Sequence, residues 1–284
     1  MKLWGIARFT FREARRRRLL WVGLGLGILF LGLFALGFSL IYREMQADIG
    51  RSPTAQAMVE FAVGQFEMAA LFVINFLIVL TAILTTITAL PSEINSHTIY
   101  AVVTKPVRRW EVLLGKWLGH AMMLTAYVLL LAGGVMLIVY VIAGYVPRHP
   151  IRGLALLVLE GLVLTSLTFL GGTRLSSLVN GVVVFMLYGL AFIGGWVEQF
   201  GSLLGNQTAV QLGHLPAIVM PSEALWRLAS HMMSPPPPLG VGFTPGGSLF
   251  AFGRPPAAST ARYGLIYVVV VLFLAILSFR RRDL

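Results

Sequence analysis

One carboxylate, Glu160, stands near the middle of an apolar stretch that runs from residue 151 to 170. A charged side chain at the centre of a bilayer is costly, so such residues commonly face the interior of a helix bundle or a transport path. Its own helical face carries Gly153, Leu164 and Leu167, none of which can pair with it. Two roles remain open: a structural residue, protonated or hydrogen-bonded to another helix, or part of a substrate path.

Several histidines and methionines are the other candidates for chemistry. Imidazole and thioether groups together suit a soft cation such as Cu(I). Their spacing here is irregular, however, and Met is also an ordinary packing residue, so the sequence favours no metal site. These residues are His214, Met220, His231, Met232 and Met233.

Catalytic motifs are missing from the sequence. It has no GxSxG, no GxxxxGK[ST] phosphate loop, no HExxH metal pair and no cysteine. We therefore expect no disulfide, no thiolate metal site and no ATP hydrolysis by this chain alone, so it is not expected to be an enzyme.

The third candidate is a polar segment, residues 91–116, between two apolar stretches. Ser92 can cap a first short amphipathic helix, and Pro106 breaks it and can begin a second one. The segment carries four cations, Lys105, Arg108, Arg109 and Lys116. It is either a rigid elbow that transmits force to both flanking helices, or a membrane-surface loop whose cations obey the positive-inside rule.

The elements that hold these residues are membrane spans. Of 284 residues, 57% are hydrophobic and only 12% are charged, far from the quarter or so that is typical of soluble domains. A bilayer core needs about 20 apolar residues per helix. Six segments meet this requirement, and they predict an all-α polytopic membrane protein with spans at about residues 19–41, 69–90, 117–143, 151–170, 179–196 and 264–279.

Lys and Arg residues predict the orientation. With the N-terminus inside, 15 of the 22 lie on the cytoplasmic side, so both termini are expected to be cytoplasmic. Because these cations sit beside the ends of spans rather than across a soluble face, we do not expect nucleic-acid binding.

Two flanking regions complete the single transmembrane domain, residues 1–284. Residues 1–18 alternate apolar and basic positions as an interfacial elbow helix would. A short helix is expected from Pro53, before the second span. Residues 197–262 form the longest outer loop, with an interfacial helix in which Ser222 is a cap and Glu223 and Arg227 are an i,i+4 pair, followed by a Pro/Gly-rich stretch.

The polar segment also carries an ordered pattern: an acidic residue, a pair ending in Thr, a basic residue before Pro-Val, a basic-x-Glu and a Leu-Leu-Gly-Lys. These positions are Glu93, His97, Thr98, Lys105, Pro106, Val107, Arg109, Glu111, Leu113, Leu114, Gly115, Lys116, Leu118 and Gly119. The pattern resembles the cytoplasmic coupling region of ABC type-2 permeases, which often have Gly where this chain has His97.

The resemblance implies a permease subunit of an ABC exporter in the inner membrane, with six spans, an elbow helix and coupling helices. A second permease copy or a related partner would pair with it, and two cytoplasmic ATPase subunits would supply the ATP and Mg, so that no cofactor is expected in this chain. The ATPase-docking residues would be Glu93, Thr98, Lys105, Pro106, Arg108 and Arg109.

A stand-alone carrier or channel is the alternative. It predicts inverted repeats and broken spans, of which the sequence shows no convincing sign, and a proton-driven carrier would usually show a relay of carboxylates rather than one. An intramembrane enzyme or a passive scaffold is a further alternative. The apolar spans fit lipids, hydrophobic drugs or peptides alike.

Overall fold

Regular secondary structure in the described part of the chain is helical throughout. The computed structural model describes residues 5, 18–48, 53–89, 108–236 and 256–281. These residues contain no strand, which confirms the all-α prediction. The helices are α2 (Arg18–Asp48), α3 (Pro53–Thr86), α6 (Arg109–Ala143), α7 (Pro150–Gly172), α8 (Ser177–Leu203), α9 (Gln207–Val219), α10 (Ser222–Met233) and α11 (Ser259–Arg280).

Six of these helices are long and apolar enough to cross a membrane, as predicted: α2, α3, α6, α7, α8 and α11. Several are longer than a bilayer requires, since α3 has 34 residues and α6 has 35, whereas about 20 suffice. The short helix expected from Pro53 is not separate; it forms the first turns of α3. The expected elbow helix, most of the polar segment and most of the Pro/Gly-rich stretch lie outside the described residues.

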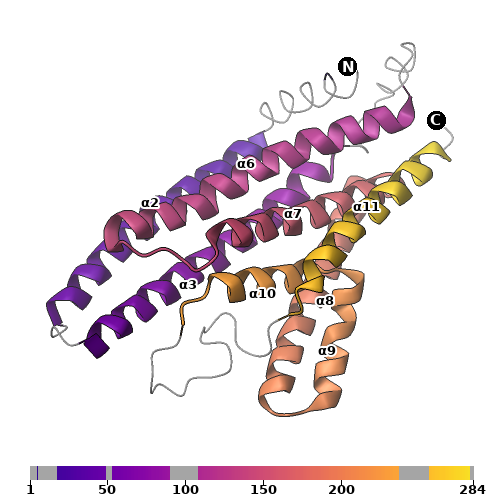
Figure 1. The fold of residues 1–284 in the computed structure, drawn as a ribbon. Helices are drawn as coiled ribbons and strands as arrows, with labels where there is room; N and C mark the ends of the chain where they lie inside the picture. Colours follow the sequence, from indigo (N-terminus) through magenta and orange to yellow (C-terminus); the bar gives the residue numbers. More distant parts are fainter. Residues whose placement is uncertain (1–4, 6–17, 49–52, 90–107, 237–255, 282–284) are drawn as a thin grey trace.

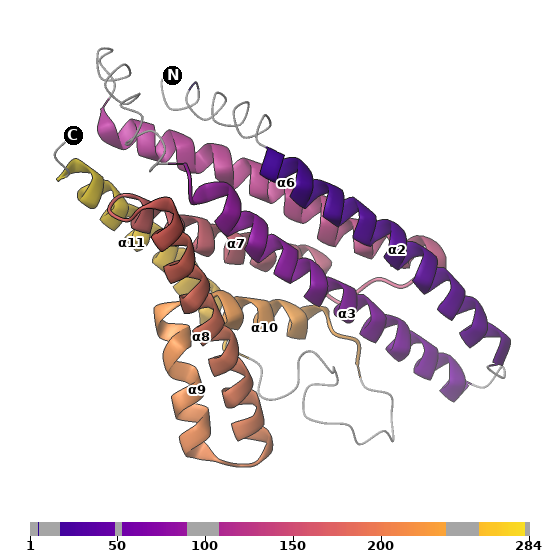
Figure 2. The same ribbon diagram turned by 180° about the vertical axis from the view of Figure 1, so that it is seen from behind.

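The helices form one layered bundle with a projecting hairpin. Helices α2, α3, α6 and α7 lie alongside one another, and α11 runs along α7 (Figure 1). Helices α8 and α9 form an antiparallel pair that leans away from them, while α10 lies between the two parts (Figure 2). The main apolar core joins residues of α3, α6, α7, α8 and α10.

Small residues bring α8 and α9 together. A Cβ atom added to Gly194 would lie 2.8 Å from the carbonyl oxygen of Gly213, and one added to Gly213 would lie 2.6 Å from that of Gly194. A real Cβ atom would clash at these distances, so the two backbones can lie this close only because both residues are glycines. Small residues allow helices in membranes to approach closely in this way.

The helix α10 differs from the expected interfacial helix. Ten of its twelve residues are buried, among them Trp226 at 1% exposure and Leu225 at 0%. It packs against α7, α8 and α11, so its polar face is covered as well as its apolar stripe. Its N-cap is Pro221, and Ser222 is instead its first helical residue.

Candidate functional site

The two ends of the polar segment are tied together at its base. Lys116 of α6 is 7% exposed, and its Nζ donates a 3.2 Å hydrogen bond to the carbonyl oxygen of Ala89, just after α3. A cation at the C-terminal end of a helix also interacts favourably with the helix dipole. One buried contact therefore joins Ala89, just before the polar segment, to Lys116, its last residue.

A small second core surrounds this contact. Its buried part consists of Ala89, Leu113, Phe169, Ala275 and Phe279. We call these five residues together with Lys116 the segment root, because they lie where the polar segment meets the bundle. They come from the ends of α3, α6, α7 and α11. A displacement of this root must therefore be shared by four membrane helices, because packed side chains do not deform freely.

Polar contacts strengthen the same end of the bundle. Thr173, at the end of α7, shares a 2.8 Å hydrogen bond with Ser278 of α11, and the Nε of Arg174 donates to the same Ser278 oxygen at 3.1 Å. Trp117 of α6 donates to Ser166 of α7 at 3.0 Å. These hydrogen bonds link α7 to both α6 and α11 at this end of the bundle.

The expected docking residues lie at the edge of the described chain. Arg108 is exposed, and its backbone N–H donates a 2.9 Å hydrogen bond to the Glu111 carboxylate. This is the Glu half of a capping box, and it fixes where α6 begins. Arg109 is the first residue of α6. The remaining docking residues, Glu93, Thr98, Lys105 and Pro106, lie outside the described residues.

Glu160 lies in the centre of the bundle, away from the segment root. It is fully buried on α7, and the side chain of Asn75 on α3 faces its carboxylate. Glu223 of α10 and Tyr188 of α8 are its other polar neighbours. Among the described residues, neither Glu160 oxygen has a hydrogen bond of ordinary geometry, and the Asn75 carbonyl oxygen has none. We call these four residues the central polar cluster.

An aromatic groove lies beside this cluster, between α3 and α8. Its volume is about 290 Å³, and Asn75 and Tyr188 of the central polar cluster contribute to its lining. The rest of the lining is apolar: Phe72, Val73, Phe76 and Phe192. Phe76 is 53% exposed, so the groove is accessible from the side of the bundle.

A ladder of rings continues from the groove along α8. Tyr188, Phe192, Trp196 and Phe200 follow one another at i,i+4 spacing, with centroid distances of 6.3, 6.2 and 5.7 Å. Phe72 of α3 joins the ladder at 6.5 Å from Phe192. Such distances are within the range in which aromatic pairs attract one another.

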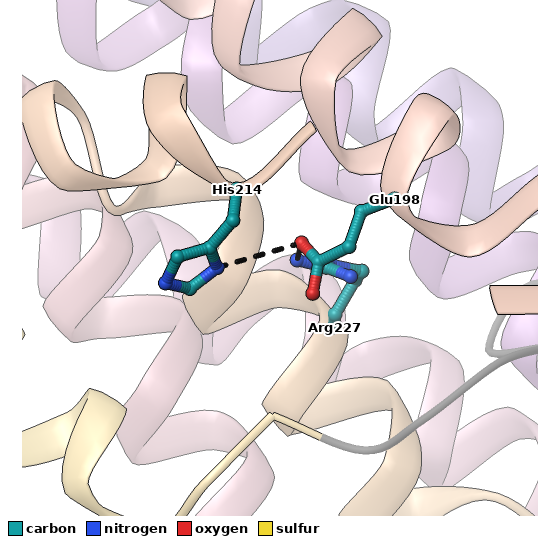
Figure 3. A network of polar contacts seen from close by, with 3 residues as sticks. All are labelled: Glu198, His214 and Arg227. Carbon is teal, nitrogen blue, oxygen red and sulfur yellow. Dashed lines mark hydrogen bonds and ion pairs between the residues drawn. The ribbon is translucent and has the colours of Figure 1, made fainter. Parts of the chain in front are cut away.

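An ion pair fastens the α8–α9 hairpin to α10. The Nη2 of Arg227 lies 2.6 Å from Oε2 of Glu198, and His214 of α9 lies 3.7 Å from the same oxygen (Figure 3). Arg227 is only 4% exposed. Its ion pair is with Glu198 rather than with Glu223, the i,i+4 partner expected from the sequence.

Glu223 is thus a buried carboxyl that has no ion pair within the described part of the chain. Burial raises its pKa to about 8, although the positive charge of Arg227 acts in the opposite direction. Its side chain packs against Gly195 of α8, where a Cβ atom would lie 2.6 Å from its Cγ. The carboxyl therefore spends much of its time protonated at neutral pH, as buried acids without a counter-ion do.

A further buried carboxyl, Glu67 of α3, was not found from the sequence. It is 0% exposed, and neither of its oxygens has a hydrogen bond among the described residues. The apolar run that predicts the second span starts at residue 69, so Glu67 lies just outside it. Its position two turns before Asn75 on the same helix could have marked it.

The histidines and methionines are dispersed. Across the described ranges there is no group of three or more His, Cys, Asp or Glu that could hold a metal ion. Met220 and Met233 are buried packing residues of the main core. His214 contacts Glu198, as described above.

Comparison with known proteins gives one clear result. A family model described as "ABC-2 family transporter protein" matches residues 4–284, nearly the whole chain. A search of curated proteins gave no significant match.

Proposed function

Because the chain belongs to the ABC-2 family of transporter proteins, we propose that this permease subunit serves an exporter powered by a separate ATPase. The observation that carries the proposal is the match over nearly the whole length of a multi-pass membrane protein with six spans. ATP and Mg would be bound by the ATPase chains and not by this one. A second permease copy, identical or related, would complete the transporter.

Coupling would pass through the polar segment, residues 91–116, and its docking residues. The segment root supports this role, because it connects the polar segment to the ends of four helices. ATP binding can favour one transporter state only through different affinities for the two states. A push on the segment would tilt α3 and α6 together with α7 and α11, and this tilt would be the difference between the states.

The substrate path would pass the central polar cluster. The Glu160 oxygens and the Asn75 carbonyl oxygen are buried without ordinary hydrogen bonds among the described residues, and the aromatic groove lies next to them. Buried polar groups left unsatisfied cost free energy, so proteins keep them mainly where a ligand or water satisfies them at some stage. In this scheme both termini face the cytoplasm of an inner-membrane transporter.

A charge-reversal pair tests the docking. The permease would be purified in mild detergent with its ATPase subunit, and Arg108→Glu with Arg109→Glu should lower the amount of ATPase retained. The double variant Arg280→Glu with Arg281→Glu is the matched control, since it reverses two charges of the exposed end of α11. Unchanged retention in the first variant, or equal loss in both, would count against docking at the segment.

A further inference from the structure

Glu160, the carboxyl group in the centre of the bundle, has no cation beside it among the described residues. The polar groups around the Glu160 carboxylate are Asn75, Glu223 and Tyr188, none of which is a cation. The buried guanidinium of Arg227 is held by Glu198 at 2.6 Å. An ionised carboxylate in a low-dielectric interior is stable only with a counter-ion or several hydrogen bonds, and the described residues supply neither to Glu160.

The aromatic groove adds a second recognition element. Phe72, Phe76 and Phe192 line it, and Asn75 and Tyr188 separate it from Glu160. The face of an aromatic ring attracts a cation, more strongly when both are desolvated. Rings and a buried carboxyl together are thus suited to a positively charged group attached to an apolar body.

We propose that the aromatic groove and Glu160 bind an organic cation with an aromatic or apolar body, and that such amphiphilic cations are the substrate class of the exporter. This inference rests on the proposed function for the word substrate. The binding site itself depends only on the groove, the central polar cluster and the charges around them.

The charges select against the other amphiphiles that the apolar spans would accept. An anionic lipid or fatty acid would find no counter-ion beside Glu160, and its headgroup would repel this carboxyl whenever it is ionised, strongly because the interior screens charges little. An uncharged compound would gain the apolar contacts of the groove but would leave Glu160 without a partner. A cation gains both, and the ring ladder from Tyr188 to Phe200 extends the same surface along α8.

Tetraphenylphosphonium and tetraphenylborate provide the test, because they have nearly the same shape and opposite charge. Binding of radiolabelled tetraphenylphosphonium to the permease in lipid nanodiscs would be measured against empty nanodiscs. We expect saturable binding of tetraphenylphosphonium and no saturable binding of radiolabelled tetraphenylborate, each measured alone because the two ions form a sparingly soluble salt. In Glu160→Gln the affinity for tetraphenylphosphonium should be at least about tenfold lower, the loss typical of one charge-assisted contact. Saturable binding of tetraphenylborate as tight as that of tetraphenylphosphonium would overturn the proposal.

Two further variants keep the test decisive. Glu60→Gln removes a carboxylate from the exposed part of α3, distant in sequence from Asn75, and should bind like the original protein. Phe192→Ala keeps Glu160 but removes a wall of the groove, and should weaken binding several-fold even if Glu160→Gln fails to fold. Wild-type binding in Phe192→Ala would overturn the proposal. Retention of the ATPase in the same preparations separates the two ideas: if the ATPase remains bound but the cation does not bind, only the substrate class is wrong.

Discussion

Removal of one partner of the Glu198–Arg227 ion pair should destabilise the protein by very different amounts depending on which partner is lost. Arg227 is 4% exposed and Glu198 is 20% exposed. In Glu198→Leu the buried guanidinium loses its counter-ion, and its Nε already lacks a hydrogen bond among the described residues. An uncompensated buried charge of this kind costs about 3–5 kcal/mol.

The reverse substitution should cost less. In Arg227→Met the Glu198 carboxylate remains partly exposed, so water can solvate it, and His214 lies 3.7 Å away. We expect a loss of about 1–3 kcal/mol, the cost of a lost hydrogen bond to a charged group. The double variant replaces both charges with apolar groups of similar size, and should lose less than the sum because no charge is left unpaired.

Unfolding in mixed micelles with increasing SDS would give the free energies for a double-mutant cycle. The expected result is a larger loss for Glu198→Leu than for Arg227→Met and a coupling energy of about 3 kcal/mol, at the upper end for contacting residues. Equal losses from both single variants, or losses that simply add in the double variant, would show that the ion pair does not hold α10 to α8 in the way described.

Three other substitutions have definite outcomes. Burial raises the pKa of Glu223 from 4.5 to about 8, so the folded state loses stability as pH rises through this range. From pH 6.5 to 8 the free energy of unfolding of Glu223→Gln should therefore rise by about 2 kcal/mol relative to that of the original protein in the same assay. Parallel pH profiles of the two proteins would contradict this. Glu111→Ala removes the carboxylate that caps the start of α6 and should cost about 1 kcal/mol, seen as faster amide hydrogen exchange in the first turns of α6 but not at its far end; unchanged exchange would argue against the cap. Gly213→Ala brings a Cβ to 2.6 Å from a backbone oxygen of α8 and should lower stability by about 1–3 kcal/mol. The control Gly189→Ala, whose Cβ would meet nothing within 4 Å, should raise stability slightly. Equal effects of both substitutions would mean that α8 and α9 are not in close contact.

The membrane helices were predictable because their signal is local. A run of about 20 apolar residues stabilises a helix in a bilayer whatever its neighbours are. Five of the six runs lie within helices of the structure, and the second, residues 69–90, lies mostly in α3 but extends past its end at Thr86. The ends were less predictable, because a helix can continue past its apolar residues into turns that the apolar pattern does not mark. The helix α3 begins at Pro53, well before the apolar run, and its first turns include exposed residues such as Glu60.

The central polar cluster depends on contacts that no single segment contains. Glu160 has only apolar residues and glycine on its own face, and its polar neighbours come from α3, α8 and α10. The ion pair of Arg227 likewise joins residues of two helices, and its partner Glu198 lies 29 positions away in the sequence. The i,i+4 rule predicts Glu223 as the partner of Arg227, because this rule describes pairs within one helix and takes no account of a neighbouring helix.

The covered position of α10 constrains how the protein is made. This helix carries Glu223 and Arg227 as well as Trp226, so it suits neither lipid nor water when alone, and α11, which covers part of it, is translated last of the described helices. The faces of α10 that pack on α7 and α8 can be covered as soon as α10 is made, but the part that α11 covers stays open until α11 emerges from the ribosome and inserts. Nascent chains halted before residue 259 should consequently be targets for membrane proteases and insertion chaperones.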